Sequence, residues 1–398
     1  MTCSLPLSNF ARLHAEKITP SKMNETVEHY SIPSWFTGLP EVCHSSEIKS
    51  SKFILPDCDV ILVSRLNPEV HKVWRVGPKN GTVTRLASTE WAVVLPLEDS
   101  DLDYLNCALE TREFKFQMNS YVTGTTGSHK RVRTSDFLKL TIPNNSISAK
   151  KNIGKTHELF RRHIAIQSLI EPLVFEILST LFCSWFIEFE PVIKKTEGSI
   201  PFGLDADSSS LFPNTFKDSE IGPIPVNWSL KRYSDCIYLK YGKALKSEDR
   251  VDGNIPTIGS NGIIGYHDEL LVNGPGIVIG RKGNPGTVMW INEDFFPIDT
   301  TFFVVPKSPH IPLEFLYFSL KFANLPWFAA DSAVPGVNRE VILRQNIVIP
   351  PKELIEKFTT IVKSSLALIR NSKHTINSLN MASEILFPRL ISNKLKNN

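Results

Sequence analysis

The feature of this sequence that most constrains its fold is a long-period internal repeat. Four short segments occur twice in the same order, each second copy displaced by a little over half of the 398 residues. Each match is short, but four at nearly one displacement predict two copies of one folding unit. Two copies related by a pseudo-two-fold axis would present two similar surfaces and read a target at two places. The matched pairs are ILVSR (61–65) with IVIGR (277–281), GTV (81–83) with GTV (286–288), TIP (141–143) with VIP (348–350), and EIL (176–178) with EIL (384–386).

Composition is that of a globular protein with more than one domain, because 398 residues exceed one ordinary core and 42% of them are hydrophobic. No uninterrupted run of 18 apolar residues occurs, and the first residues lack a secretory pattern, so we expect no membrane span and no signal peptide. The six cysteines are scattered without a CxxC pair, as is typical of reduced thiols in a cytoplasm. The net charge of +3 is small, so any surface for nucleic acid must be local.

Two strand-rich regions alternate with two helical regions. In the strand-rich regions, short runs of β-branched and aromatic residues are broken by Gly, Pro and Asn. From about Lys151, apolar residues recur at three- to five-residue spacing, which predicts an amphipathic helix with a kink or break at Pro172. The predicted regions are 1–148 (first β-rich domain), 149–200 (first helix), 201–220 (linker), 221–350 (second β-rich domain) and 351–398 (second helix).

The second long helix has a heptad pattern. Pro351 suits its first turn, where a missing N–H costs nothing. An apolar seam of this kind requires a partner helix, and the first long helix is the obvious one. We therefore predict an α+β fold in which two β-rich domains alternate with two long helices that pack as an antiparallel coiled coil. The seam residues are Ile355, Phe358, Val362, Ile369, Ile376, Leu379 and Leu386, and the serines that interrupt them are Ser365, Ser372 and Ser383.

The sequence lacks the motifs of common catalytic sites. Asn67-Pro68-Glu69 and Asn284-Pro285-Gly286 do not fit the loop with which amino-methyltransferases hold the target amine. The GKT at 154–156 lacks the upstream glycine of a phosphate-binding loop, because Ala149 stands there. The ten histidines form no metal-ligand pattern, and the nearest approach to a metal-dependent nuclease motif has its two parts far apart. We therefore predict a binding function, with no catalytic residues and no metal site.

The candidate binding residues are basic and polar residues on small-residue loops and at strand ends. Glycines in GTTGSHKRVR (124–133) would let the backbone approach a ligand, and the basic side chains suit phosphate oxygens or guanine edges. A solvated turn is the alternative for this loop, and a surface salt bridge is the alternative for the strand-end arginines. The second copy has a comparable loop, SAVPGVNRE (332–340). The candidates are Arg65, His129, Lys130, Arg131 and Arg133 in the first copy, and Lys243, Lys246, Asn261, Tyr266, Arg281, Lys282, Asn338 and Arg339 in the second.

In the order of these segments, the chain resembles the DNA specificity subunit of type I restriction–modification systems. The resemblance covers nearly the whole chain, although the residues before about Val27 match the start of the second copy poorly. The segments that carry it best are YGKALKSEDRVDGNIPTIGSNGIIGYHDE (241–269), GPGIVIGRKGNPGTV (274–288), PIDTTFFVVP (297–306), SAVPGVNRE (332–340) and IVIPP (347–351).

The resemblance implies two target-recognition domains, each reading one half of a split, asymmetric DNA sequence, with the long helices setting the spacer. It implies a non-catalytic, cytoplasmic chain that binds no cofactor itself. The partners would be double-stranded DNA, two methyltransferase subunits and restriction subunits, and the protein partners would supply S-adenosylmethionine, ATP and magnesium. A helical protein-interaction scaffold without DNA recognition is the alternative, and the mild net charge is its main support. A nuclease or methyltransferase in its own right is disfavoured by the missing motifs.

Overall fold

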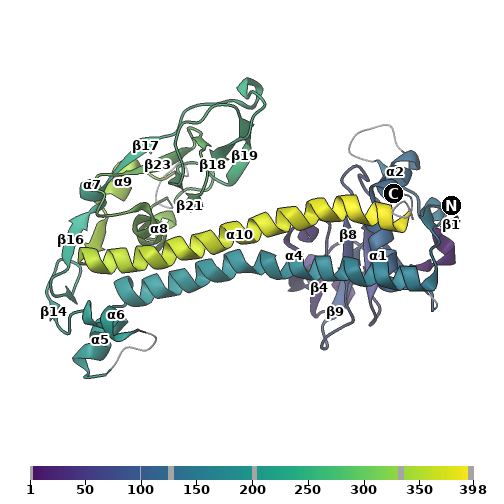
Figure 1. The fold of residues 1–398 in the computed structure, drawn as a ribbon, viewed down its shortest axis with the longest axis horizontal. Coiled ribbons are helices and arrows are strands. Elements are labelled where there is room, and N and C mark those ends of the chain that lie inside the picture. Colours follow the sequence, from purple (N-terminus) through teal and green to yellow (C-terminus); the bar gives the residue numbers. More distant parts are fainter. Residues whose placement is uncertain (1–2, 99, 124–129, 200–203, 330–335, 393–398) are drawn as a thin grey trace. The chain divides into compact units, whose positions relative to one another are not determined.

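The computed structural model describes residues 3–98, 100–123, 130–199, 204–329 and 336–392. The chain forms two compact units (Figure 1). Unit 1 consists of Met1–Ser168 and Lys373–Asn398, and unit 2 consists of Leu169–Ser372. The boundary between them falls inside both long helices, α4 (Ile147–Phe182) and α10 (Lys352–Ile391). Each unit therefore contains a β-rich domain and one part of each long helix.

The two β-rich domains contain four-stranded antiparallel sheets of the same topology, which confirms the predicted repeat. The strand order is β2-β10-β7-β8 in unit 1 and β17-β23-β20-β21 in unit 2. The central strands β7 and β20 are buried along their whole length, as expected for their runs of β-branched residues. The bounds are β2 Ala11–His14, β7 Val60–Ser64, β8 Val73–Val76, β10 Trp91–Pro96, β17 Ile237–Tyr241, β20 Gly276–Gly280, β21 Val288–Ile291 and β23 Thr301–Pro306.

The repeat extends to the N-terminal residues, which match the second copy poorly in sequence. Strand β1 (Ser4–Pro6) pairs with β13 (Thr141–Pro143), just as β16 (Ser229–Arg232) pairs with β24 (Asn346–Ile349). Further along, the N–H of Leu97 bonds to the carbonyl of Phe10 at 2.9 Å, and that of Lys307 bonds to Cys236 at 2.8 Å. The first residues of the chain therefore take the structural place of residues 229–241.

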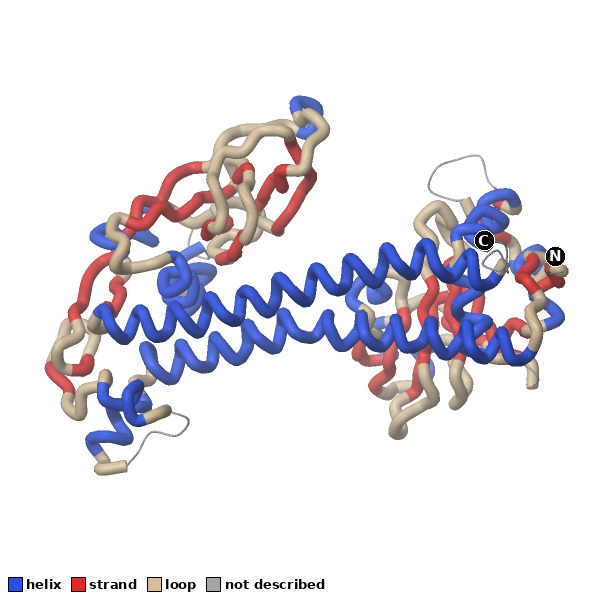
Figure 2. Tube along the Cα trace, viewed as in Figure 1, coloured by secondary structure: helices blue, strands red, loops and turns tan. Residues whose placement is uncertain are grey.

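The units differ in their second sheets, whose strands are red in Figure 2 like all the others. Unit 1 has a five-stranded sheet of order β3-β6-β9-β4-β5, and unit 2 has a three-stranded sheet of order β19-β18-β22. The repeat is thus a common scaffold with a different insertion in each unit. The bounds are β3 Lys17–Ile18, β4 Thr26–Tyr30, β5 Glu41–His44, β6 Lys52–Ile54, β9 Thr84–Ser88, β18 Ile255–Gly259, β19 Gly262–His267 and β22 Phe296–Pro297.

The two long helices pack against each other with opposite chain directions inside each unit. In unit 1 the start of α4 meets the end of α10, with the rings of His157 and Phe387 4.8 Å apart. In unit 2 the end of α4 meets the start of α10, with Phe182 and Phe358 5.5 Å apart. The heptad prediction is confirmed, because the seam residues of α10 are buried or half-buried whereas those between them are mostly exposed.

The helix α4 passes through Pro172, where a kink or a break was predicted. No break occurs there: α4 continues as one helix past Pro172, and a π-helical turn, Cys183–Ile187, follows it. The residues on either side of Pro172, from 169 to 177, are exposed or half-buried, so the helix continues there without being held by tight packing. By length and composition alone, the helix over Ile147–Ile187 could cross a membrane. The sequence predicted no membrane span, because it contains no unbroken run of apolar residues. Its two ends are packed inside the cores of the units, at Ile153 and Phe182.

The region predicted as a linker holds ordered structure within its described part. Asp205 caps a short helix, α6 (Ala206–Ser210), by accepting a hydrogen bond from the N–H of Ser208 at 2.6 Å. Phe212 is fully buried, with its ring 5.4 Å from that of Trp185. A polar composition predicted a linker, but this one aromatic residue anchors the segment to the core of unit 2.

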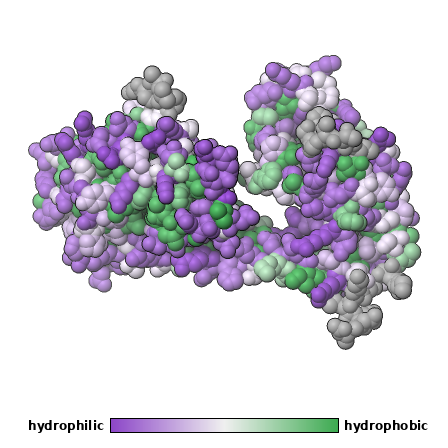
Figure 3. Space-filling view, turned by 90° about the horizontal axis from the view of Figure 1, so that it is seen from above, coloured by the Kyte–Doolittle hydropathy of each residue, from purple (hydrophilic) through white to green (hydrophobic). Residues whose placement is uncertain are grey.

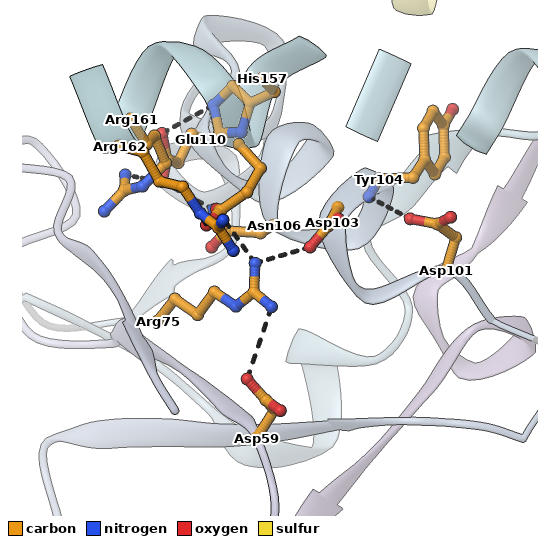
Figure 4. A network of polar contacts seen from close by, with 11 residues as sticks. Asp59, Arg75, Asp101, Asp103, Tyr104, Asn106, Glu110, His157, Arg161 and Arg162 are labelled. Carbon is orange, nitrogen blue, oxygen red and sulfur yellow. Dashed lines mark hydrogen bonds and ion pairs between the residues drawn. The ribbon is translucent and has the colours of Figure 1, made fainter. Parts of the chain in front are cut away.

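In unit 1 a polar network joins the β-rich domain to the long helices (Figure 4). Arg75 of β8 contacts Asp103 of α1 (Leu102–Glu110) at 2.6 Å and Glu158 of α4 at 3.0 Å. It also lies 3.4 Å from Asp59, which precedes β7. One guanidinium group therefore ties the sheet, the helix that covers it and the long helix together.

A second part of the network is centred on Glu110, at the end of α1. Its carboxylate lies 3.2 Å from Nε2 of His157 and forms an ion pair with Arg161, both on α4. Asn106 donates a further hydrogen bond to it at 3.2 Å. Burial alone would raise the pKa of Glu110, but the His157 hydrogen bond and the charge of Arg161 outweigh it and lower that pKa below its usual value.

In unit 2 the corresponding attachment is aromatic. Phe182 of α4 is fully buried, and its ring lies between 5.0 and 5.9 Å from five other phenylalanine rings. Three of these belong to α8 (Leu313–Phe322), which covers the four-stranded sheet as α1 does in unit 1. The five partners are Phe186, Phe315, Phe318, Phe322 and Phe358.

Candidate nucleic-acid interface

In unit 2 two predicted binding residues, Arg281 and Arg339, meet at one aromatic ring. Arg281 follows β20, and Arg339 opens α9 (Arg339–Arg344). Their guanidinium carbons lie 5.3 and 5.5 Å from the ring centroid of Tyr241, the last residue of β17. Tyr241 is not among the residues predicted from the sequence, because it is brought to Arg281 and Arg339, which lie far from it along the chain, only by the fold.

The backbone fixes this arrangement. The N–H of Arg281 bonds to the carbonyl of Thr300 at 2.9 Å, and the N–H of Val337 bonds to the carbonyl of Arg281 at 3.0 Å. The Tyr241 ring packs 5.0 Å from Phe302 on the neighbouring strand. The loop that carries Arg339 is therefore held directly beside the strand end that carries Arg281.

Lysines surround this cluster. Lys282 follows Arg281 and forms a β-bridge with Gly336, and the N–H of Lys243 bonds to the carbonyl of Pro297 at 3.0 Å. Both lysine side chains are exposed and have no ion-pair partner among the described residues. Lys246 lies 3.5 Å from Glu248, so its charge is partly compensated.

The polar candidates Asn261, Tyr266 and Asn338 have different roles. The Asn338 side chain caps α9 by accepting a hydrogen bond from the N–H of Glu340 at 2.8 Å. Asn261 is exposed in the turn between β18 and β19, and Tyr266 is exposed on β19. Ser260 approaches Gly283 so closely that a side chain there would touch it. The hairpin turn with Asn261 therefore lies against the loop that follows Lys282.

In unit 1 two of the candidate basic residues form ion pairs within the unit. Arg131 lies 2.7 Å from Glu90, and Lys130 lies 2.5 Å from Glu69. Ion pairs were considered as the alternative only for the strand-end arginines, Arg65 and Arg281, and a solvated turn for this loop, so the pairing of Lys130 and Arg131 was not anticipated. Exposed ion pairs contribute about 0–1 kcal/mol, so they could open to another anion.

Arg65, Arg133 and His129 complete the candidates of unit 1. Arg65 donates to the hydroxyl of Thr134 at 2.8 Å and to the carbonyl of Thr89 at 2.6 Å, and burial lowers its pKa. Arg133 is exposed, without a side-chain partner in the part of the chain that the structure describes. His129 lies outside the described residues.

The strand registers show which residues of the two units correspond. Arg65 bonds through its N–H to the carbonyl of Glu90, as Arg281 does to Thr300, so Glu90 occupies the place of Thr300. The pairing of β2 with β10, followed one residue beyond His14, places Ala15 where Tyr241 stands in unit 2. Among its described residues, unit 1 thus has a carboxylate and no aromatic ring at this site.

No group of three or more His, Cys, Asp or Glu side chains within the described ranges is placed to hold a metal ion. The geometry of the site is that of a basic surface with aromatic support, which suits an anionic polymer such as a nucleic acid.

Comparison with known proteins gives the class. Residues 225–381 match the family model described as the type I restriction modification DNA specificity domain. The EcoprrI specificity subunit of Escherichia coli is 29% identical over 181 residues, which are 42% of this chain and 44% of that protein. The MjaIX specificity subunit of Methanocaldococcus jannaschii is 20% identical over 326 residues, 76% of this chain and 71% of that protein. The chain thus matches less than half the length of the first of these relatives.

A solved structure has the same fold along nearly the whole chain. The type I restriction–modification S subunit from M. genitalium matches with a TM-score of 0.58 at 14% identity, covering 98% of this chain and 96% of that one. The chain is thus similar to these specificity subunits in sequence, most clearly over residues 225–381, and in fold over nearly its whole length. The resemblance of the chain to type I restriction–modification specificity subunits is confirmed.

Proposed function

We propose that this chain is the DNA-recognition subunit of a type I restriction–modification complex and reads a bipartite, asymmetric target through its two β-rich domains. The observation that carries this proposal is the repeated sheet with a strand-end arginine at the same place in each unit, Arg65 and Arg281. The second sheets differ between the units, as two different half-sites require. Phosphate contacts would supply affinity, and loop side chains would read base edges.

Partner subunits would supply the catalysis. We propose that this cytoplasmic chain binds neither S-adenosylmethionine, ATP nor magnesium, and that two methyltransferase subunits and the restriction subunits carry them. Adenine methylation or cleavage would then be directed to the sequence that this chain reads, and the long helices would set the spacer between the half-sites.

Apolar surface on the long helices supports the binding of protein partners. In unit 2, Leu169, Leu173 and Ile177 follow one face of α4 and are 57%, 52% and 65% exposed. Below them lies a cavity of about 680 Å³ that is lined by Ile177 and Trp185 among others. In unit 1, Met381 and Ile385 of α10 are also exposed. Figure 3 shows apolar areas on one face of the molecule, and exposed apolar patches commonly mark protein interfaces.

The first test is to co-express the chain with the methyltransferase subunit encoded beside it and to map methylated adenines by long-read sequencing. A split, asymmetric methylated motif is expected, and it would supply both half-sites and the spacer. A soluble complex that produces no new methylation would count against DNA recognition and favour the scaffold alternative.

The second test separates the two domains. Arg131→Gln should weaken recognition of one half-site and Arg339→Gln that of the other, measured by filter binding with each half-site scrambled in turn. Loss of both half-sites in either variant would contradict a two-domain reader. A DNA reader should also lose affinity steeply as salt rises, whereas a scaffold should retain no DNA at any salt concentration.

A further inference from the structure

We propose that Arg281 and Arg339, held on the ring of Tyr241, form a preassembled clamp for one backbone phosphate of DNA and so make unit 2 the electrostatic anchor of the chain. The inference rests on the proposed function. It adds a positioning residue, Tyr241, and an asymmetry between the two units.

The two guanidinium groups have unused hydrogen-bonding capacity. Arg281 has no carboxylate partner among the described residues, and its Nε is buried without a hydrogen-bond partner. Arg339 pairs with Glu340, its exposed neighbour in sequence, at 3.0 Å. Two like charges at one ring repel each other, and the attraction of each for the ring offsets that repulsion only in part. A phosphate oxygen placed between them would satisfy both donors and remove the repulsion.

The backbone that carries the clamp is held in place before any ligand arrives. Arg281 is tied to Thr300 and Val337 through its backbone, and Arg339 opens a helix whose cap is Asn338. Tyr241 is fixed from below by the ring of Phe302. A preorganised pair loses little conformational entropy on binding, which favours its use as an anchor.

The surrounding charge is positive. Exposed Lys243 and Lys282 stand on the adjoining loops, against two acidic neighbours, Glu340 and Asp299. Of these acids, only Glu340 has an ion pair with either arginine within the described part of the chain. The local excess of positive charge would attract a DNA strand although the whole chain has a net charge of only +3.

In unit 1 one arginine of the corresponding site, Arg131, is compensated by a carboxylate. Glu90 stands where unit 2 has Thr300, and it neutralises Arg131 at 2.7 Å. Ala15 stands in the register position of Tyr241, so no ring supports Arg65 there. A phosphate at this site of unit 1 would have to displace a carboxylate.

The test uses the full chain and a duplex of arbitrary sequence, with affinity measured by fluorescence anisotropy across a salt series. Arg281→Gln and Arg339→Gln should each reduce the slope of log K against log salt by about 0.9, the contribution of one phosphate. The double variant should reduce it by the same amount, because both groups hold one phosphate. Equal unfolding temperatures of variants and wild type would show that the fold is kept.

The contribution of the Tyr241 ring is tested by substitutions that remove or keep it. Tyr241→Leu should weaken binding by about two- to fivefold, the usual contribution of an exposed cation–π contact, whereas Tyr241→Phe keeps the ring and should bind as wild type does. Tyr238→Leu is the matched control, since Tyr238 lies on the same strand and has a cation, Lys307, 4.5 Å from its ring. It should have no effect.

Two outcomes would overturn the clamp. If wild type binds DNA and both arginine variants keep its slope of log K against log salt, Arg281 and Arg339 hold no phosphate. If the arginine variants lost affinity only for a duplex that contains the recognised sequence, and bound duplexes of arbitrary sequence as wild type does, the arginines would read bases. A wild type that binds no DNA at any salt would instead refute the proposed function itself.

Discussion

The two units share one sheet topology but attach their β-rich domains to the long helices by different chemistry. In unit 1 the attachment is an ionic network around Arg75 and Glu110, and in unit 2 it is a cluster of rings around Phe182. An ionic network depends on direction, pH and salt, whereas ring packing depends mainly on buried area. The repeat therefore preserves the geometry by which each β-rich domain is attached to the long helices, whereas the chemistry of that attachment varies.

The largest expected effect is in unit 2. Phe182→Ala should destabilise unit 2 by about 3–5 kcal/mol, because it removes a fully buried ring from a cluster that cannot collapse around the cavity. Urea unfolding followed by hydrogen exchange, resolved by segment, would assign the loss to residues 169–372. Phe116→Ala is the control, since Phe116 is 75% exposed and should change stability by less than about 0.5 kcal/mol. Equal loss in both units would contradict separate attachments.

The corresponding change in unit 1 should cost less. Glu110→Gln removes the charge that pairs with His157 and Arg161, and we expect a loss of about 1–3 kcal/mol because the carboxylate is partly exposed. The loss should appear in exchange at residues 102–110 and 150–165. Glu176→Gln, on an exposed position of α4, is the control and should have little effect. A cost as large as that of Phe182→Ala would remove the distinction between the two attachments.

Low pH should weaken the ionic attachment in unit 1. The pKa of Glu110 is lowered in the folded chain, so the group stays charged in the folded state at a pH where the unfolded chain has taken up a proton. Its contribution is therefore fully present above the ordinary glutamate value of about 4.3 and is lost as pH falls through the lowered pKa. The stability difference between wild type and Glu110→Gln should shrink over that range. A difference that stays constant to low pH would show that Glu110 acts by packing alone.

Local patterns in the sequence predicted much of the fold. The heptad residues Ile355, Phe358 and Val362 are buried, because a helix turns every 3.6 residues and its apolar positions must share one face. The strands β7 and β20 follow from their runs of β-branched residues. The place of β1 and β2 in the repeat could not be predicted, because strand pairing fixes their position without requiring similar side chains.

The candidate site was predicted less completely. Arg281 was proposed because it ends a strand equivalent to that of Arg65, and Arg339 because basic residues on small-residue loops suit phosphates. Tyr241 was missed, because its ring reaches them only when β17, β20 and α9 have come together. The pairing of Arg131 with Glu90 was equally invisible, since it depends on which strand end faces which loop. Contacts between distant segments are set by register, which periodicity along the chain does not encode.

The smallest expected effect is a gain of stability in unit 2. Thr359 of α10 is buried, and its hydroxyl has no hydrogen-bond partner within the described part of the chain. Thr359→Val keeps the branched shape and replaces that hydroxyl by a methyl group, so unit 2 should gain up to about 1 kcal/mol in thermal or urea unfolding. Thr360→Val is the matched control, because the exposed Thr360 hydroxyl donates to the carbonyl of Glu356 at 2.9 Å and its loss should give no gain. If Thr359→Val destabilised unit 2, the attachment there would depend on a polar contact after all, and the contrast with unit 1 would be one of degree.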